Sequence, residues 1–400
     1  MKKYIALLLA LVMVFALAAC GSKQEAAPAG SEEAAAPVEA SGDVKVAMIT
    51  DYGDITDQSF NQTTYEACKA FCEKNAVDFK YYKPTDDSTA ARVEMIDQAI
   101  AEGYNVVVMP GYAFAGAIVE TQDLYPDVKF VALDVSEYDI TSSFYKVDED
   151  GNVTEELIDP SNEPHVSENV FSAVYQEELC GYMAGVAAVK LGYTKLGFLG
   201  GMAVPAVVRY GYGFVQGADA AAAELNLTAV EIKYAYGNQF YGDSDITAYM
   251  DTWYAAGTEV VFACGGGIFT SAGEAAAKVG GKVIGVDVDQ AGTIDGLYGE
   301  GMTVTSAMKG LAATVNAELS AILDGTFEGG KVDNLGLVSD VPAENFVQIA
   351  GSTQFSDTFT EDDYAALVAA MNAGDVTVSN DITTEPAVSV VTVDYQGNIK

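Results

Sequence analysis

Short apolar runs and amphipathic segments alternate along the first half of the chain. The apolar runs are rich in β-branched residues and predict buried strands, whereas the amphipathic segments repeat their apolar positions at helical spacing. The predicted strands are 44–50, 77–82, 105–109 and 128–133, and the predicted helices are 59–75, 88–102 and 113–125. Ser88 fits the N-cap of the second helix and Gly103 its end. This alternation is typical of a mostly parallel sheet with helices on both faces.

The same alternation begins again after a polar, turn-rich stretch at 138–169, which predicts an inserted surface loop or hairpin. The second set of predicted strands is 170–174, 195–200, 229–235, 259–264 and 282–287, and its predicted helices are 176–191, 206–225, 243–256 and 269–279. Further strands and helices are expected in 303–325 and 334–400. The sequence therefore predicts two similar α/β units.

Polar side chains follow the first strand directly. Asp51 and Asp57 lie in an acidic turn, and Phe60 and Asn61 begin the helix after it. In a parallel sheet, the loops at the carboxyl ends of strands line the ligand crevice. Asp134, at the end of the fourth strand, should reach the same edge. This edge is suited to a small polar ligand with an apolar face.

The segment TDYGDITDQSFNQ (50–62) resembles the signature of the basic membrane protein family of substrate-binding lipoproteins, which includes purine nucleoside receptors of ABC-type importers. Four further segments resemble that family in the same order: GFLGG (197–201), PAVVRYGYGFVQG (205–217), IGVDVDQ (284–290) and TSAMKG (305–310). The resemblance covers most of the chain from Lys45 to about Gly310.

The resemblance implies a bilobed type I periplasmic-binding-protein fold, with two Rossmann-like α/β lobes and a hinge. The chain of such a protein crosses between the lobes three times, here near 168–174, 291–303 and 338–350. Lobe 1 would then comprise 44–168 plus about 303–338, and lobe 2 would comprise 169–302 plus about 339–400.

The N-terminus predicts a lipoprotein signal peptide over 1–19. Lys2 and Lys3 precede a short apolar run, which ends in small residues before Cys20, as in a lipobox. Lipid on Cys20 would anchor the protein at the extracytoplasmic face of the cell membrane, and ordinary secretion is the alternative. Residues 20–43 lack aromatic residues and predict a flexible tether.

The formal net charge of −38 excludes a nucleic-acid partner, since no basic stripe is present to neutralise phosphates. A neutral or cationic ligand is mildly favoured. Four cysteines lie in apolar contexts without the spacing of metal ligands, and His165 is the one histidine of the chain. We therefore expect buried free thiols at Cys68, Cys72, Cys180 and Cys264, and no catalytic residue, metal or cofactor.

The resemblance also implies a set of ligand-binding residues. Phe60 would stack on a base, with aromatic residues of the other lobe completing the site, and Asp134 would read the base edge. Asp287 would bind ribose, and Lys309 would bind ribose or orient that acid. The full set is Asp51, Asp57, Phe60, Asn61, Asp134, Tyr210, Phe240, Gly265, Asp287 and Lys309.

Several of these assignments have alternatives. Asp57 could serve as the N-cap of the helix that follows it, and each aromatic residue could be core packing. Tyr212 could face the ligand in place of Tyr210, which stands where the family has phenylalanine. Tyr112 likewise follows Gly111 where the family often has Gly-Phe. The added hydroxyls suggest a more polar purine nucleoside or another polar metabolite.

The favoured function is a monomeric receptor that binds a nucleoside, in particular a purine nucleoside, and delivers it to the permease and ATPase of an ABC importer. One alternative is a metal-dependent nucleoside hydrolase with Asp51, Asp54 and Asp57 around calcium, although no histidine follows them to act as an acid. Another is a surface sensor or adhesin lipoprotein without a transport role.

Overall fold

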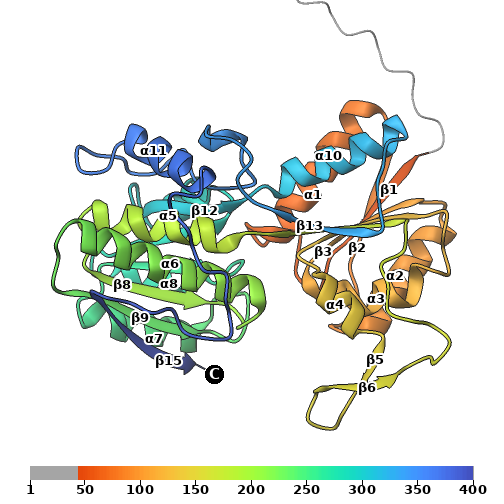
Figure 1. Ribbon diagram of the computed structural model, residues 1–400, viewed down its shortest axis with the longest axis horizontal. Helices are drawn as coiled ribbons and strands as arrows, with labels where there is room; N and C mark the ends of the chain where they lie inside the picture. Colours follow the sequence, from red (N-terminus) through yellow and green to blue (C-terminus); the bar gives the residue numbers. More distant parts are fainter. Residues whose placement is uncertain (1–43, 400) are drawn as a thin grey trace, which may run out of the picture. The chain divides into compact units, whose positions relative to one another are not determined.

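The structure is a computed structural model that describes residues 44–399. The predicted signal peptide, the lipidation site at Cys20 and the tether lie outside the described residues. The described part contains two large β-sheets, each covered by helices on both faces (Figure 1). This arrangement confirms the predicted α/β class.

The first sheet has six parallel strands in the order β13-β7-β4-β3-β1-β2. Its strands are β1 (Lys45–Ile49), β2 (Asp78–Tyr82), β3 (Val106–Pro110), β4 (Lys129–Leu133), β7 (Val170–Tyr175) and β13 (Lys331–Leu335). One face packs against α1 (Phe60–Asn75) and α10 (Leu311–Asp324). The other packs against α2 (Thr89–Ala101), the 3₁₀ turn η1 (Tyr112–Phe114), α3 (Ala115–Thr121) and α4 (Glu137–Ser142).

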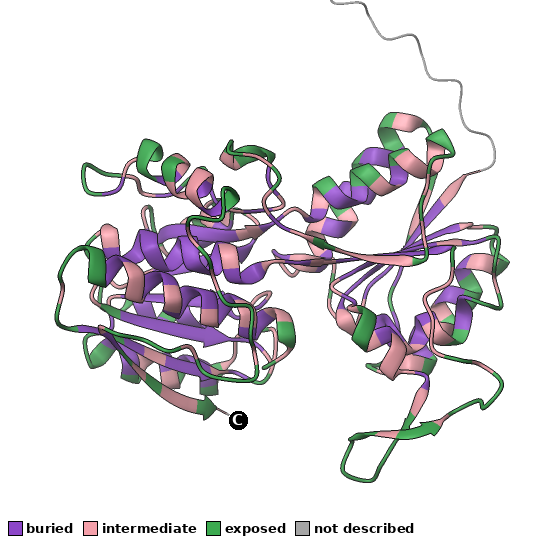
Figure 2. Ribbon diagram, viewed as in Figure 1, coloured by how far each residue is buried: buried purple, intermediate pink, exposed green. Residues whose placement is uncertain are grey.

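The alternation of side chains along β1 explains why helices cover both faces. Val46 and Met48 belong to the core beneath α1, whereas Ala47 and Ile49 belong to the core beneath α2 and α3. Successive side chains of a strand point to opposite faces, so a continuous apolar run needs cover on both sides. Figure 2 shows the central strands of both sheets buried, whereas edge strands such as β13 and β15 and the outer faces of many helices are partly or fully exposed.

The second sheet has seven strands in the order β14-β12-β11-β10-β8-β9-β15, and only the β12–β14 pair is antiparallel. Its strands are β8 (Lys195–Gly200), β9 (Val230–Tyr236), β10 (Val260–Cys264), β11 (Lys282–Asp287), β12 (Thr303–Lys309), β14 (Val347–Ile349) and β15 (Val391–Asn398). On one face lie α5 (Glu177–Lys190), α6 (Pro205–Glu224) and α11 (Glu361–Asn372); on the other lie α7 (Ser244–Ala255), α8 (Phe269–Ala277) and α9 (Ala291–Tyr298). A 3₁₀ turn, η2 (Pro342–Glu344), precedes β14.

The polar stretch at 138–169 contains the expected hairpin, formed by β5 (Tyr145–Val147) and β6 (Val153–Leu157). It also contains most of α4, which the sequence analysis did not predict. Ser136 and Asp139 form a capping box at the start of this short helix, and Ile140 anchors it in the core.

Two strands belong to the sheet opposite to the one expected from the predicted lobe boundaries. β7 pairs with β4 and β13 in the first sheet, although residues from 169 onward were assigned to the second unit. β12 pairs with β11 and β14 in the second sheet, although residues from 303 onward were assigned to the first. The chain therefore leaves the first sheet after Tyr175 and returns to it after Lys309. Both strands are buried over most of their length, and burial alone carries no signal for the sheet that a strand joins.

Candidate functional site

A cavity of about 750 Å³ lies at the carboxyl ends of strands from both sheets. All ten residues predicted to bind ligand line it, and Tyr212 does not. The lining from the first half of the chain is residues 51–54, 56–58, 60, 61, 83, 111, 112, 134, 136, 138, 139 and 174. The lining from the second half is residues 204–207, 209, 210, 240–242, 264–267, 269, 270, 286, 287, 309 and 382.

The acidic turn before α1 is held together by its own backbone. Asp57 accepts hydrogen bonds from the backbone N–H groups of Ser59 at 2.9 Å, Asn61 at 2.8 Å and Gln62 at 3.0 Å. It thereby performs the capping role, while the side chain of Ser59, at the N-cap position, makes no capping hydrogen bond. Asp51 accepts from the Gly53 N–H at 2.6 Å and from the Asn61 amide at 3.2 Å. Both carboxylates order the turn as well as line the cavity.

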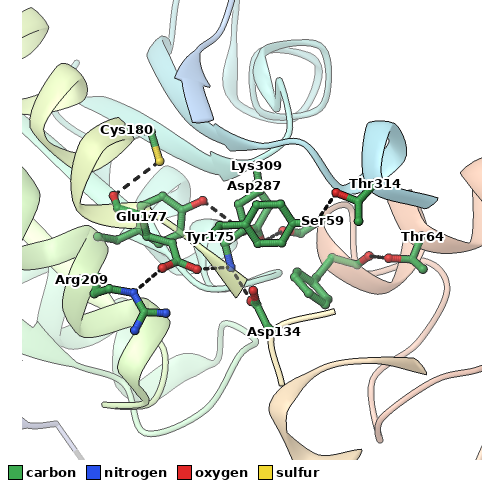
Figure 3. Close-up of polar contacts among 12 residues, drawn as sticks. Ser59, Thr64, Asp134, Tyr175, Glu177, Cys180, Arg209, Asp287, Lys309 and Thr314 are labelled. Carbon is green, nitrogen blue, oxygen red and sulfur yellow. Dashed lines mark hydrogen bonds and ion pairs between the residues drawn. The ribbon is translucent and has the colours of Figure 1, made fainter. Parts of the chain in front are cut away.

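A buried charge cluster lies at the centre of the cavity wall (Figure 3). The Lys309 ammonium, at the end of β12, forms an ion pair with Asp134 from the end of β4, and its Nζ lies 3.1 Å from Glu177 Oε1. Glu177 Oε2 accepts a hydrogen bond from Arg209 Nε at 2.5 Å. The cluster therefore links the first sheet, through Asp134, to strand β12 of the second sheet and to α5 and α6, which cover that sheet.

Glu177 and Arg209 were missed in the sequence analysis, although each carries a signal. Glu177 opens a helix that is apolar over most of its length, and Arg209 is the one cation in the segment PAVVRYGYGF. A charge in such a context needs a buried partner. Close packing of α5 on α6 brings these two together, because a Cβ on Gly213 would lie 2.1 Å from the Glu178 carbonyl oxygen.

Burial and neighbouring charges shift the pKa values of this cluster in opposite directions. Burial alone would lower the pKa of Lys309, but the carboxylates of Asp134, Glu177 and Asp287 raise it above its usual value. Burial raises the pKa of Asp134 to about 6, against the attraction of Lys309. The pKa of Glu177 is lowered, since Lys309 and Arg209 together outweigh its burial. Lys309 is therefore a cation, and Glu177 is its fixed counter-ion.

Asp134 and Asp287 occupy corresponding places at the ends of β4 and β11. Both adopt left-handed backbone conformations, with φ of 60° and 64°. Such conformations are uncommon outside glycine and often mark functional sites. Asp287 Oδ2 accepts a hydrogen bond from Ser59 Oγ at 2.6 Å, which joins the two halves of the chain across the cavity. Asp134 Oδ1 is buried and has no hydrogen-bond partner among residues 44–399.

The predicted aromatic residues differ in how much of their surface is free. Phe60 and Phe240 are half-buried in the lining, whereas Tyr210 is 1% exposed. The Lys309 ammonium lies 5.2 Å from the ring centroid of Phe60 and 5.4 Å from that of Tyr210. Tyr212 instead packs near Tyr234, at 6.2 Å between ring centroids. Of the aromatic residues predicted to bind ligand, Phe60 and Phe240 are thus the two whose rings keep accessible surface in the cavity.

Gly265 follows β10 and makes room for one of those rings. Its φ is +156°, and a Cβ there would lie 3.0 Å from Phe240 Cδ1 and 3.0 Å from the backbone of Gly201. A side chain at this position would force the ring of Phe240 or the backbone of Gly201 to shift by a few tenths of an ångström. Gly265 thus supports the ring of Phe240 in the lining.

Within residues 44–399, no group of three or more histidine, cysteine, aspartate or glutamate side chains is arranged to hold a metal ion. The four cysteines of this part of the chain are free and buried, as predicted. Among the helices that the structure describes, none combines the length and the apolar character needed to cross a membrane.

Two α/β sheets whose strand ends meet at a shared, partly aromatic cavity define the periplasmic-binding-protein fold. Solved structures share this fold. An ABC transporter solute-binding protein from Conexibacter woesei superposes with a TM-score of 0.63 at 22% identity, over 84% of this chain and 99% of that one. A solute-binding protein from Aeropyrum pernix gives a TM-score of 0.61 at 19% identity, over 85% of this chain and 88% of that one.

The chain belongs to the family of PnrA-like substrate-binding proteins of ABC transporters, whose family model (Bmp) matches residues 44–355. Relatives include the ABC transporter nucleoside-binding protein BmpA of Lactococcus lactis, which is 27% identical over 70% of this chain and 72% of its own length. Basic membrane protein B of Borreliella afzelii is 26% identical over 63% of this chain and 67% of its own length.

Family membership confirms the resemblance seen in the sequence. It makes this chain an extracytoplasmic substrate-binding protein of the kind that works with a permease and an ATPase, and not an enzyme. The hydrolase alternative, with Asp51, Asp54 and Asp57 around a metal, is thereby set aside. Asp54 instead pairs with Lys83 at 2.9 Å on the exposed side of the turn.

Proposed function

We propose that this protein binds a nucleoside, in particular a purine nucleoside, in the cavity between its two sheets. The observation that carries the proposal is that one cavity contains both partly exposed aromatic rings and hydrogen-bond acceptors without a partner in the described part of the chain. Phe60 and Phe240 offer half-buried rings, and Asp134 Oδ1 and Asn61 Oδ1 are buried acceptors without a partner in the described part of the chain. A buried acceptor left unpaired is costly, so a ligand with matching N–H or O–H donors gains from filling it.

A nucleoside meets both requirements. Its base has a face that stacks on an aromatic ring, a contact that contributes about 1–3 kcal/mol in nucleic-acid-binding proteins. Its base edge and ribose carry donors that suit carboxylates. The name of the Lactococcus relative, a nucleoside-binding protein, supports the same ligand class.

The charges of the lining favour an uncharged ligand over a phosphorylated one. Each cation of the lining already has a carboxylate partner: Lys83 has Asp54, Lys309 has Asp134, and Arg209 has Glu177. A phosphate would bring further negative charge beside Asp51, Asp57 and Asp287, without a free cation among the described lining residues. The ligand in this proposal is therefore the nucleoside and not its phosphate.

In the proposed transport cycle, the liganded protein docks on a membrane permease with its two halves closed. Contacts across the cavity support such a closed form. Gln290 Nε2 donates to the Gln58 carbonyl at 3.0 Å, and Thr293 donates to the Gln58 side chain at 3.1 Å. Closure around a ligand is a hinge motion of the kind known from periplasmic binding proteins. Neighbouring genes for permeases and an ATPase would separate transport from a sensor or adhesin role.

The proposed ligand class is tested by thermal shift against nucleosides, free bases, sugars and amino acids. A ligand at a hundred times its Kd should stabilise the native state by about 2.7 kcal/mol. We expect a raised midpoint with adenosine, guanosine or inosine and no change with sugars. A shift with another class alone would contradict the proposal.

The residue assignments are tested with three variants: Asp134→Ala, Asp287→Ala and Phe60→Ala. Each should weaken binding of the ligand found in that screen while the protein keeps a cooperative unfolding transition. Normal binding by all three would overturn the assignments, whatever the ligand. Addition of calcium should leave the affinity unchanged, and calcium-dependent release of free base would contradict a purely binding role.

A further inference from the structure

The C-terminal part of the chain continues beyond the family match, which ends at residue 355. It forms α11 and then a segment, 376–390, that leads to the edge strand β15 (dark blue in Figure 1). β15 pairs in parallel with β9 and so extends the second sheet by one strand. Trp253 Nε1 and Tyr249 OH both donate to the Gln396 side chain, at 3.0 Å and 2.7 Å. The extension is therefore an integral part of the second half of the molecule.

The loop between α11 and β15 is fastened to α6 at two points. The Gln216 side chain forms a pair of hydrogen bonds with the Ser379 backbone, donating at 3.0 Å and accepting at 2.9 Å. One turn further along α6, Asp219 accepts from the backbone N–H groups of Ser389 at 3.0 Å, Val390 at 2.7 Å and Val391 at 2.9 Å. Residues 380–388 thus span a short path between two fixed anchors.

One side chain of this loop reaches the ligand cavity. Ile382 is part of the cavity lining, together with the first turns of α6 from Pro205 to Tyr210. Its sequence neighbours, Ser379-Asn380-Asp381 and Thr383-Thr384-Glu385, are all polar. Asp381 and Thr383 are exposed, whereas Ile382 is half-buried. Within residues 379–385, Ile382 is the one apolar side chain, and its place in the lining indicates a contact that the loop is built to make.

We infer that Ile382 is a specificity-determining residue, which forms an apolar wall against the bound ligand and so limits the ligand's size and shape. The Gln216–Ser379 pair is the positioning contact that holds this wall in place. The identity of the ligand in this inference rests on the proposed function. The position of the apolar wall does not. A cavity lined by both charged and apolar side chains suits a ligand with both kinds of surface.

The test measures dissociation constants by calorimetry for the full chain and its Ile382→Ala and Ile382→Trp variants. The probes are adenosine, guanosine, inosine, cytidine and uridine. A single methylene in an enclosed pocket changes selectivity by roughly 10-fold to 200-fold, and Ile382 is only half-buried. We therefore expect Ile382→Ala to weaken the best ligand about tenfold. Ile382→Trp should reverse or compress the purine-to-pyrimidine ratio of affinities.

The matched control is Val388→Ala, which removes an apolar side chain from the same loop. Val388 is 37% exposed and does not line the cavity, so its variant should bind as the wild type does. Gln216→Ala lies outside the lining and should reproduce part of the Ile382→Ala effect by releasing the loop. In the double variant the two losses should be less than additive, since both act through one side chain.

Two failures can be told apart. If the wild type binds none of the five nucleosides, the proposed ligand class is wrong, and the same variants are compared with the sugar, base or amino acid found by thermal shift. If the wild type binds a ligand and both Ile382 variants keep every dissociation constant within about twofold, far below the effect of a pocket methylene, the inference about Ile382 is overturned. Equal losses in Ile382→Ala and Val388→Ala would overturn it as well.

Discussion

Two aspartates, one at the end of a strand in each sheet, face the same lysine and yet are bound differently. Asp287, at the end of β11, has Ser59 Oγ at 2.6 Å from one oxygen and the Tyr210 hydroxyl at 3.4 Å from the other. Asp134, after β4, pairs with Lys309 through one oxygen and leaves the other unpartnered within the described residues. Both have a left-handed backbone. From this difference we propose that Asp287 holds the two halves together and that Asp134 contacts the ligand.

Lys309 lies close to both aspartates, and its replacement should have the largest effect on stability and ligand binding. Lys309→Met keeps the length of the side chain but leaves buried carboxylates without their cation, and its side chain is 3% exposed. Breaking a buried ion pair from one side typically costs about 3–5 kcal/mol. We expect a loss of this size in urea unfolding, together with loss of ligand binding. Lys278→Met, which removes a surface ion pair with Asp251, is the control and should unfold as the wild type does.

Asp134→Asn should affect binding more than folding. The variant keeps the shape of the side chain, and Lys309 still has Glu177 at 3.1 Å, so the cluster retains a counter-ion. Loss of hydrogen bonds to a charged acceptor is worth about 1.5–3 kcal/mol, or roughly tenfold to a hundredfold in affinity. Calorimetry on the variant and the wild type measures this ratio. Unchanged affinity would mean that the free oxygen of Asp134 does not meet the ligand.

The pH dependence of binding sharpens the same assignment. Burial raises the pKa of Asp134 to about 6 in the free protein, above its ordinary 3.8. A ligand that donates to the carboxylate requires the ionised form, so affinity should fall as the pH drops from 7 to 5, approaching tenfold per pH unit below 6. The stability of the free protein should change with pH in the opposite direction. A carboxyl group whose pKa is raised by folding contributes stability at low pH, and this contribution is lost as the pH rises through 6.

The pH profile has an internal control. Burial also raises the pKa of Glu178 to about 7, but Glu178 does not line the cavity, so its titration should change stability and not affinity. In Asp134→Asn the affinity should become flat between pH 5 and 7. A slope that survives in this variant would assign the titration to another group, such as Asp51 or Asp57, whose pKa values burial also raises.

Ser59→Ala tests the role given to Asp287. The variant removes the hydroxyl that reaches across the cavity and leaves Asp287 Oδ2, which is buried, without this donor. Such a loss typically costs about 1–3 kcal/mol. Because the contact joins the two halves, we expect its loss to weaken ligand binding about fivefold or more, in addition to this loss of stability in the free protein. A large loss of stability with unchanged affinity would instead make this contact part of the core.

The comparison also marks what the sequence could and could not foretell. The strands β1, β4 and β11 are mostly apolar and buried, with Asp51, Asp134 and Asp287 at or just after their carboxyl ends, and both features are local in the sequence. The pairing of Ser59 with Asp287 joins residues far apart in the chain and depends on how two sheets face each other. The position of Ile382 was equally unpredictable from the sequence. Its place in the lining depends on hydrogen bonds between its loop and α6, and no sequence motif indicates those bonds.

The strands β7 and β12 illustrate the same limit in the fold. β7 was predicted as a strand at 170–174, whereas β12 was expected only as part of the mixed segment 303–325. Each pairs in the sheet opposite to the one expected, because partner choice depends on neighbouring strands and not on the strand's own residues. The short helix α4 was missed for a different reason. Its capping box at Ser136 and Asp139 was present in the sequence, but the helix is too short to show an apolar period.

Tyr210→Phe should have the smallest effect of these variants. It is also the most sensitive test of the proposed difference in role between Asp134 and Asp287. The Tyr210 hydroxyl lies 3.4 Å from both Asp287 Oδ1 and the Ala307 carbonyl, so its hydrogen bonds are long and its removal should cost less than about 1 kcal/mol. Affinity, measured by calorimetry beside Ser59→Ala, should change by less than about threefold, because the ring itself remains. A tenfold loss would show that the hydroxyl donates to the ligand or releases Asp287 for it. Asp287 would then be a second ligand-binding carboxylate, and the division of roles between the two strand ends would fail.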